Sequence, residues 1–129
     1  MTPLTEEWVG KAEGDFQVAI HEWEAQDPVY DAICFHSQQC AEKYFKALLQ
    51  NQGEDPPRTH NLMVLVELIK DNRDFLEKSE QVGQLEFYAI AFRYPGETAD
   101  RIDAQEAVEI MKTIRHLTRK RLGLEPDGK

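Results

Sequence analysis

Two short polar clusters contain the residues best suited to chemistry in this sequence. Arg58-Thr59-His60-Asn61 precedes one apolar segment, and Arg93-Tyr94-Pro95 follows another. A guanidinium group can donate two parallel hydrogen bonds to a phosphate or carboxylate, and an imidazole can add a further donor. If the fold brings Arg58, His60 and Arg93 together, they would bind an anion such as a nucleotide phosphate.

The same clusters also have a purely structural interpretation. Thr59 or Asn61 could cap a following helix, with the imidazole of His60 bonding a nearby carbonyl group. Arg93 could donate to the last carbonyl groups of the helix that it ends. Local capping requires fewer assumptions, but the sequence leaves both interpretations open.

Metal chemistry and nucleophilic catalysis have little support in the sequence. His36 and Cys40 are spaced so that a helix would place them on one side, but His60 would be a distant third ligand. A packed cysteine beside a partly buried histidine is the simpler interpretation, so we predict no metal. The sequence has no Gly-x-Ser-x-Gly motif and no phosphate-binding glycine loop. We therefore predict no cofactor and no catalytic residue of a standard type.

Length, composition and charge favour one acidic, soluble, globular domain. The chain has 129 residues, of which 41% are hydrophobic and 30% charged, so it is long enough to bury a core. Its formal net charge is −9, which disfavours RNA or DNA as a partner because non-specific binding needs clustered basic residues. No apolar run is long enough to cross a membrane, so no membrane partner is expected.

The cysteines and the first residues favour a cytoplasmic location. Cys34 and Cys40 lie six residues apart on a predicted helix and point to different faces, so they cannot form a disulfide with each other. The first residues, MTPLTEEWVG, lack the basic and apolar segments of a signal peptide. We therefore expect a reducing, cytoplasmic setting in which both thiols are packed.

One uninterrupted helical segment, residues 27–53, is expected to organise the fold. Asp27 and Pro28 are a typical helix start, and Gly53 is a typical helix end. The predicted buried face carries Tyr30, Ile33, Cys34, Ser37, Ala41, Tyr44, Phe45 and Leu48. An ordinary solvated surface is predicted for the outer side, with Gln39, Glu42, Lys43 and Lys46. Phe35 and Leu49 also point away from the buried face, which suggests a contact with another subunit.

The other helices predict an all-α fold, an antiparallel up-and-down bundle of four to five helices. They span about residues 5–25, 61–70, 76 or 79 to 92, and 99–122, with Thr5 as the expected cap of the first. The third should bury Leu62, Leu65, Val66 and Ile69. Residues 71–74 are expected to form a polar break. Residues 1–124 would form the bundle and residues 125–129 a polar tail.

Asp15 interrupts the apolar stripe of the first predicted helix. A carboxylate at the edge of this stripe would reach water, which is the ordinary interpretation. A buried carboxylate would need a basic partner from another helix, because a buried unpaired charge is costly. The second interpretation makes Asp15 a member of a structural ion pair, and we adopt it as a hypothesis.

Five motifs that occur in the right order over nearly the whole chain resemble the HEPN domain family. They are Trp8-x-x-Lys11-Ala12-x-x-Asp15-Phe16-x-x-Ala19, Tyr30-Asp31-Ala32-x-Cys34-Phe35-His36-x-Gln38-Gln39-x-Ala41-Glu42-Lys43, Lys46-Ala47-Leu48-Leu49, Pro57-Arg58-Thr59-His60-Asn61-Leu62 and Arg93-Tyr94-Pro95. The resemblance implies an antiparallel helical bundle that usually forms a homodimer. It also implies that small proteins of this kind often accompany a minimal nucleotidyltransferase.

Many other members of this family are metal-independent ribonucleases of toxin–antitoxin and antiviral systems. The resemblance implies that their chemistry depends on an arginine followed four to six residues later by a histidine. In this sequence neither Arg93 nor Arg101 has a histidine in that window, and His116 follows Arg115 directly. Without a histidine for proton transfer beside the arginine, the standard ribonuclease motif is absent.

These observations lead to a non-catalytic accessory protein as the main hypothesis. It would be a cytoplasmic homodimer that contacts nucleotide or substrate together with a nucleotidyltransferase partner, in a toxin–antitoxin-like module. The predicted nucleotide- or partner-binding residues are Arg93, Tyr94, Arg58, His60, His36 and Lys43. One alternative is a diverged ribonuclease that uses Arg93 with a histidine from another helix. A second alternative is a purely structural dimerisation module.

Overall fold

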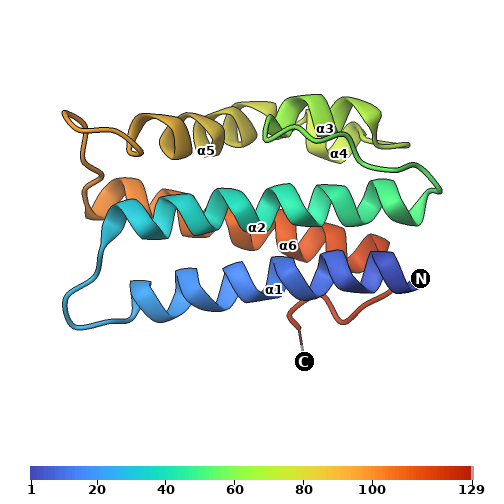
Figure 1. Cartoon of the computed structure of the whole chain (residues 1–129), viewed down its shortest axis with the longest axis horizontal. Coiled ribbons are helices and arrows are strands. Elements are labelled where there is room, and N and C mark those ends of the chain that lie inside the picture. Colours follow the sequence, from blue (N-terminus) through green and yellow to red (C-terminus); the bar gives the residue numbers. More distant parts are fainter. Residues whose placement is uncertain (129) are drawn as a thin grey trace.

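The computed structural model describes residues 1–128, and this part of the chain contains helices and no strand. The helices are α1 (Pro3–Trp23), α2 (Tyr30–Asn51), α3 (Leu62–Leu68), α4 (Arg73–Leu76), α5 (Ser79–Ala91) and α6 (Arg101–Arg121). α1 and α5 run in one direction and α2 and α6 in the other (Figure 1). The predicted all-α bundle is therefore confirmed.

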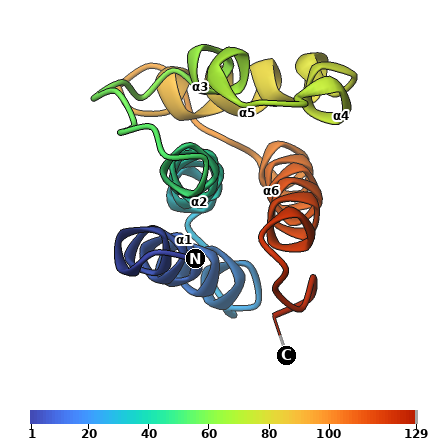
Figure 2. The ribbon, with the colours of Figure 1, turned by 90° about the vertical axis from the view of Figure 1, so that its right-hand side faces the viewer.

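α2 lies at the centre of the bundle. α1 packs along one side of it, α6 along a second, and α3 and α5 form a layer across a third (Figure 2). This central position explains why most of α2 is buried, including the large side chains of Tyr44 and Phe45. The ring of Phe75, from α4, packs edge-on against Phe45 with 5.3 Å between ring centres. Burial of such aromatic rings supplies much of the hydrophobic free energy of folding.

The buried apolar residues agree with several sequence predictions. Leu62, Leu65 and Val66 of α3 are fully buried, and Ile69 nearly so. Both cysteines of α2 are buried and free of any disulfide, as expected. None of the helices in residues 1–128 is long and apolar enough to cross a membrane.

The starts of α1 and α2 differ from the predicted ones. The hydroxyl of Thr2, not of Thr5, caps α1 by accepting a hydrogen bond from the backbone N–H of Thr5 at 3.1 Å. α2 begins at Tyr30, so Asp27 and Pro28 lie in the connection before it. The reason is that the carboxylate of Glu22 on α1 accepts from the N–H of the N-cap residue, Val29, at 2.8 Å. A partner on the neighbouring helix thus replaces the local cap.

The outer side of α2 is not the solvated surface that the sequence predicted. Glu42 and Lys46 are 3% and 7% exposed, and Leu49, predicted to face outward, is fully buried. Gly53 ends α2 in the left-handed conformation, with φ of 87°, and the chain then folds back along the helix until the carbonyl of His60 accepts from the Gln38 side chain. The periodicity of α2 could not show that its outer side is buried, because the segment that covers it is the loop between α2 and α3.

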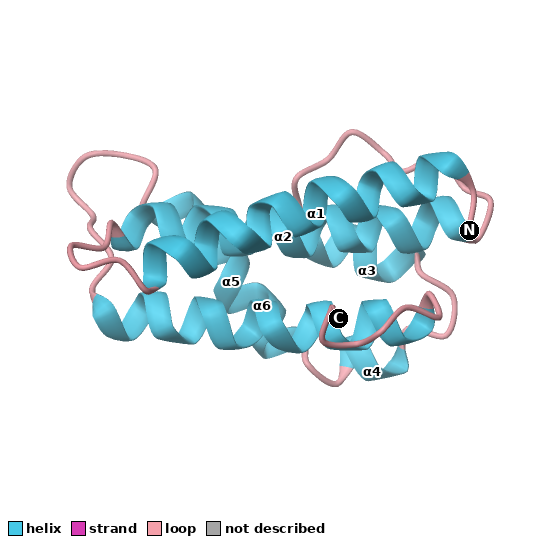
Figure 3. Cartoon of the chain, turned by 90° about the horizontal axis from the view of Figure 1, so that it is seen from below, coloured by secondary structure: helices cyan, strands magenta, loops and turns pink. Residues whose placement is uncertain are grey.

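Two smaller features complete the described chain. The predicted polar break at residues 71–74 overlaps α4, a single helical turn that is held by buried Phe75. After α6, Gly123 turns the chain with φ of 75°, and the carbonyl of Glu125 accepts from Arg119 Nε at 2.6 Å. The segment after α6 therefore folds back beside that helix (Figure 3). Lys129, the last residue of the predicted tail, lies outside the described residues.

Candidate functional site

Asp15 is buried where α1 packs on α2, and two basic side chains of α2 meet it there. Its Oδ1 lies 2.8 Å from His36 Nδ1, and its Oδ2 accepts from Lys43 Nζ at 2.5 Å. His36 and Lys43 are two helical turns apart, so they project from the same side of α2. Asp15 thus has the basic partners from another helix that a buried carboxylate needs.

His36 also lines a pocket between the first half of α2 and the end of α5. This pocket has a volume of about 340 Å³, and its walls include the rings of Phe35, Tyr88 and Phe92. The rings of Tyr88 and Phe92 stack with 5.6 Å between their centres. Burial raises the pKa of Tyr88 to about 12, with Glu106 and Asp103 adding to the shift, so its hydroxyl stays protonated at neutral pH. The walls are therefore mainly aromatic and apolar, with one carboxylate, that of Asp31, which accepts a hydrogen bond from the backbone N–H of Ala99 at 2.8 Å.

Arg93 supplies a positive charge at the edge of the same pocket. Its guanidinium carbon lies 5.8 Å from the centre of the Phe35 ring, within cation–π range. No carboxylate of residues 1–128 forms a salt bridge with Arg93, and its side chain makes no hydrogen bond to the carbonyl groups that end α5. Because His36 Nδ1 faces Asp15, the other ring nitrogen, Nε2, is the one left for a ligand. Tyr94 follows Arg93 and is exposed.

The other predicted cluster has a separate position in the structure. His60 Nδ1 lies 3.0 Å from the carboxylate of Glu42, whose second oxygen is 3.2 Å from Lys46 Nζ. The side chain of Asn61 caps α3 by accepting from the N–H of Val64 at 3.1 Å, as one interpretation of the sequence proposed. His60 thus bonds a carboxylate rather than the expected carbonyl group.

The predicted site residues therefore fall into two groups. His36 shares a pocket with Arg93 and a carboxylate partner with Lys43, whereas His60 belongs with Glu42. Arg58 is exposed. Among residues 1–128, no hydrogen bond or salt bridge joins Arg58 or His60 to Arg93. The convergence of both arginines and His60 on one anion is not seen.

The sequence analysis missed a buried ionic cluster that lies between α1, α2 and α6. The carboxylate of Glu13 accepts two hydrogen bonds from Arg115, both at 2.7 Å, and a short one from the hydroxyl of Tyr44. Arg119 donates to the same hydroxyl at 3.1 Å. Burial alone would raise the pKa of Glu13, but the hydrogen bonds from Arg115 and Tyr44 lower it overall. The signal for this cluster in the sequence was Arg115, a charged side chain at the edge of the apolar stripe of α6.

A metal site does not form at the spacing that suggested one. Cys40 is fully buried and His36 is bonded to Asp15. Burial raises the pKa of the Cys40 thiol well above its usual range, and the nearby carboxylates Glu13 and Asp15 add to this shift. In the described chain, no three histidine, cysteine, aspartate or glutamate side chains are placed to hold a metal ion.

The fold and this site define a small helical-bundle protein with an aromatic pocket that has an arginine at its edge. The chain belongs to the HEPN domain family, whose family model matches residues 5–121. The resemblance noted in the sequence is therefore confirmed.

Two solved structures are similar to this fold. One is TT1696 from Thermus thermophilus, with a TM-score of 0.80, 24% identity, and 93% of this chain and 99% of that chain covered. The other is ST0689, described as an archaeal HEPN homologue, with a TM-score of 0.66, 25% identity, and 92% and 97% covered. None of the curated proteins matches the chain.

Proposed function

We propose that this protein is a non-catalytic HEPN accessory protein that holds a nucleotide or a nucleotide-bearing substrate for a nucleotidyltransferase partner. The observation that supports this most is the position of Arg93 and His36 on one aromatic-walled pocket. Arg93 is free to pair with phosphate, and the rings of Phe35 and Phe92 can pack against a nucleobase. A volume of about 340 Å³ suits one nucleotide unit rather than a long strand.

The charge distribution also favours a small ligand over a long RNA. The whole chain carries a formal net charge of −9, so it repels an extended polyanion. The positive charges near the pocket are few: Arg93 at its edge, and Lys43 two turns along α2 from His36, already paired with Asp15. One phosphate group is what this arrangement could neutralise.

The direct test is titration of the purified protein with each of ATP, GTP, CTP and UTP by calorimetry. Arg93→Ala should weaken binding by about tenfold or more, the loss expected for a charged hydrogen-bonding pair. Arg73→Ala is the matched control, since it removes an exposed arginine of α4. Equal affinity of wild type and Arg93→Ala, or no binding of any of the nucleotides, would overturn the nucleotide-binding role.

A metal-independent ribonuclease is a second candidate because His36, a histidine outside the standard motif, lies on the same pocket as Arg93. Asp15 orients the His36 ring and leaves Nε2 for proton transfer, while Arg93 could stabilise a phosphorane-like charge. We would incubate a labelled mixed RNA pool with the protein without added metal. Cleavage that is lost in both Arg93→Ala and His36→Ala would favour the ribonuclease, and no cleavage by a folded protein would exclude it.

We propose further that the protein forms a homodimer through the outer face of α5. Phe87 and Ile90 lie three residues apart on α5 and are 59% and 55% exposed, and Tyr94, in the turn just after the helix, is 64% exposed, which is unusual for three large apolar or aromatic side chains. Light scattering after gel filtration should give a dimer for wild type and a monomer for Phe87→Glu combined with Ile90→Glu. A wild-type monomer, or a dimer of the variant, would contradict this interface. A dimer without nucleotide binding would favour the purely structural role.

A further inference from the structure

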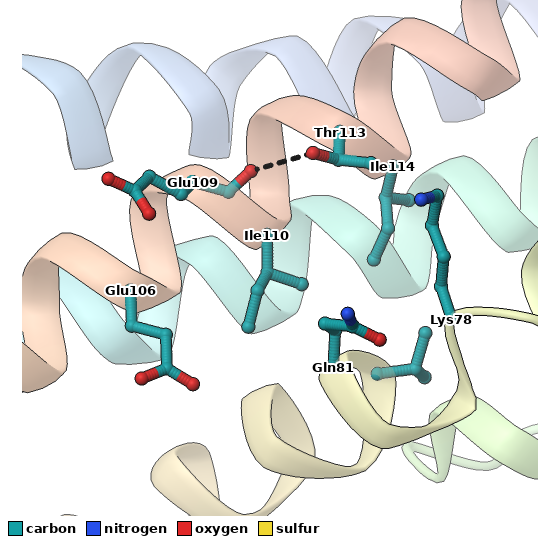
Figure 4. Close-up of a pocket in the computed structure, with 8 residues that line it drawn as sticks. Lys78, Gln81, Glu106, Glu109, Ile110, Thr113 and Ile114 are labelled. Carbon is teal, nitrogen blue, oxygen red and sulfur yellow. Dashed lines mark hydrogen bonds between the residues drawn. The ribbon is translucent and has the colours of Figure 1, made fainter.

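A groove runs between α5 and α6, which both pack on α2 but meet each other only loosely (Figure 2). Its central part is a pocket of about 230 Å³ that both helices line (Figure 4). A second hollow shares Gln81 and Glu106 with it, and a third shares Lys78 and Thr113. The three hollows therefore lie next to one another along the two helices, and we refer to them together as the groove.

The floor of the groove is apolar. Val82 of α5 and Ile110 and Ile114 of α6 lie beneath it. The hydroxyl of Thr113, at its edge, donates to the carbonyl of Glu109 at 3.1 Å within the same helix (Figure 4). Because this hydroxyl is already satisfied, the floor can receive aliphatic side chains without leaving a buried polar group unpaired.

The rim of the groove carries charges of opposite sign at its two ends. The second hollow has two glutamates, one from the first turn of α5 and one from α6, and the third hollow has two lysines, while another glutamate of α6 lines the central pocket. These side chains are Glu80, Glu106, Glu109, Lys78 and Lys112. Among residues 1–128, none of them takes part in a salt bridge, whereas His116 and Asp127 near the basic end pair with each other. Glu109 accepts a long hydrogen bond from the Gln105 side chain at 3.4 Å, but none of these five charges is neutralised by an opposite charge within the described residues, so each can still pair with a charged ligand.

We propose that this groove binds a short amphipathic helix of a partner protein. The groove walls are helices whose backbone groups are already bonded, so an inserted segment must satisfy its own backbone, as a helix does. The lining of α6 extends from Glu106 to Leu117, about 16 Å at the helical rise, which fits roughly three turns.

Charge complementarity gives this partner helix a direction. Its lysine or arginine residues lie over Glu106 and Glu109, its aspartate or glutamate residues lie over Lys78 and Lys112, and its apolar side chains enter between them. A helix can lie in the groove in two opposite directions. This charge pattern favours one of them, because in the other direction the charges of the partner helix would face like charges on the rim. This docking site does not rest on the function proposed for the aromatic pocket, although Glu106 of the groove adjoins Tyr88 of that pocket.

The probe for this site is a phage-displayed library of helix-forming peptides about 14 residues long. We would select the library on the immobilised full chain and measure the enriched peptides by fluorescence anisotropy. The groove variants are Glu106→Lys combined with Glu109→Lys, and Thr113→Arg, which fills the middle of the groove. Glu67→Lys combined with Glu77→Lys is the control with the same change in net charge at exposed positions elsewhere. Circular dichroism would verify that each variant is folded.

The expected peptides carry aliphatic residues at helical spacing and basic residues at one end. Both groove variants should bind them at least tenfold more weakly, and the control should bind them like wild type. A peptide with the basic residues changed to glutamate should recover binding to the Glu106→Lys and Glu109→Lys variant. The docking site is wrong if no peptide is enriched, or if the groove variants bind as tightly as wild type. Binding that Phe87→Glu alone removes would also overturn it, because the occupied surface would then be the outer face of α5.

Discussion

Two ionic clusters start two residues apart on α1 and differ in how completely their charges are satisfied. The carboxylate of Glu13 accepts from Arg115 and Tyr44, and Arg119 closes the cluster from α6. The carboxylate of Asp15 instead meets His36 and Lys43, side chains that remain partly exposed and can change partners. The first cluster is therefore built to hold α1, α2 and α6 together, and the second leaves groups available at the aromatic pocket.

The difference between the clusters also follows from the type of cation. Arginine keeps its charge at any ordinary pH and binds a carboxylate through two parallel hydrogen bonds, so it suits a permanent buried pair. Histidine and lysine can gain, lose or exchange partners more readily. Arg93 differs from the arginines of the Glu13 cluster, because it has no carboxylate partner among residues 1–128. It lies at the aromatic pocket, where its charge is available to a ligand.

The comparison predicts that Glu13→Ala has the largest effect on stability. This substitution leaves the largely buried Arg115 unpaired, which should lower the free energy of unfolding by about 3 kcal/mol. Urea unfolding monitored by circular dichroism measures this change. Glu109→Ala, which removes an exposed glutamate of α6, is the control. A loss below about 1 kcal/mol would show that the cluster does not hold the helices together.

Asp15→Asn should have a smaller effect of about 1 to 2 kcal/mol. The substitution removes charge-assisted hydrogen bonds, but Lys43 and His36 are exposed enough to be hydrated again. The same unfolding measurement applies, with Asp27→Asn as a control in the exposed connection before α2. If the melting temperature of Asp15→Asn equals that of wild type, the hypothesis of a structural ion pair at Asp15 is wrong.

Arg93→Ala should leave the stability almost unchanged, within about 0.5 kcal/mol, although it weakens nucleotide binding. The side chain is exposed and its one described partner is the face of the Phe35 ring, an interaction of modest energy at an exposed site. Thermal unfolding of this variant next to wild type provides the measurement. Strong destabilisation would show that Arg93 stabilises the fold, as the arginines of the Glu13 cluster are expected to do. The two regions would then not differ in their role.

The same ionic cluster should also make the stability depend on pH through Glu13. Its pKa is lowered from the ordinary value of 4.5 in the folded protein, so its contribution to stability is complete above that value. The contribution is lost as the pH falls through the lowered folded pKa. The difference in unfolding free energy between wild type and Glu13→Gln should therefore shrink below about pH 4. A difference that stays constant from pH 7 to pH 3 would contradict the assignment.

The sequence predicted most of the fold because helical periodicity and end signals are local. The long helices, the apolar stripe of α3 and the end of α2 at Gly53 all follow from neighbouring residues. The start of α2 was wrong because Glu22 of the preceding helix caps it. α4 was not predicted because one turn shows no periodicity, and only the burial of Phe75 holds it in place.

The site was harder to predict because it depends on which helices are neighbours. Asp15 was recognisable as a carboxylate in an apolar stripe, but its partners lie on α2, far along the chain. Glu42 and Lys46 were placed in solvent because nothing in the sequence shows that the segment before α3 returns along α2. Arg93 and His36 are 57 positions apart by number, and the fold alone brings them to one pocket.

The two cysteines of α2 can report when the helices around this central helix open. Both thiols are fully buried, and burial, helped by nearby aspartates, raises the pKa of Cys34 to about 12. A thiol with so little thiolate and no access to solvent reacts with an alkylating reagent only when the surrounding helices open. The rate of alkylation at each position would therefore time the opening motions of the bundle. Cys34 reports from near the aromatic pocket, and Cys40 from beside the Glu13 cluster.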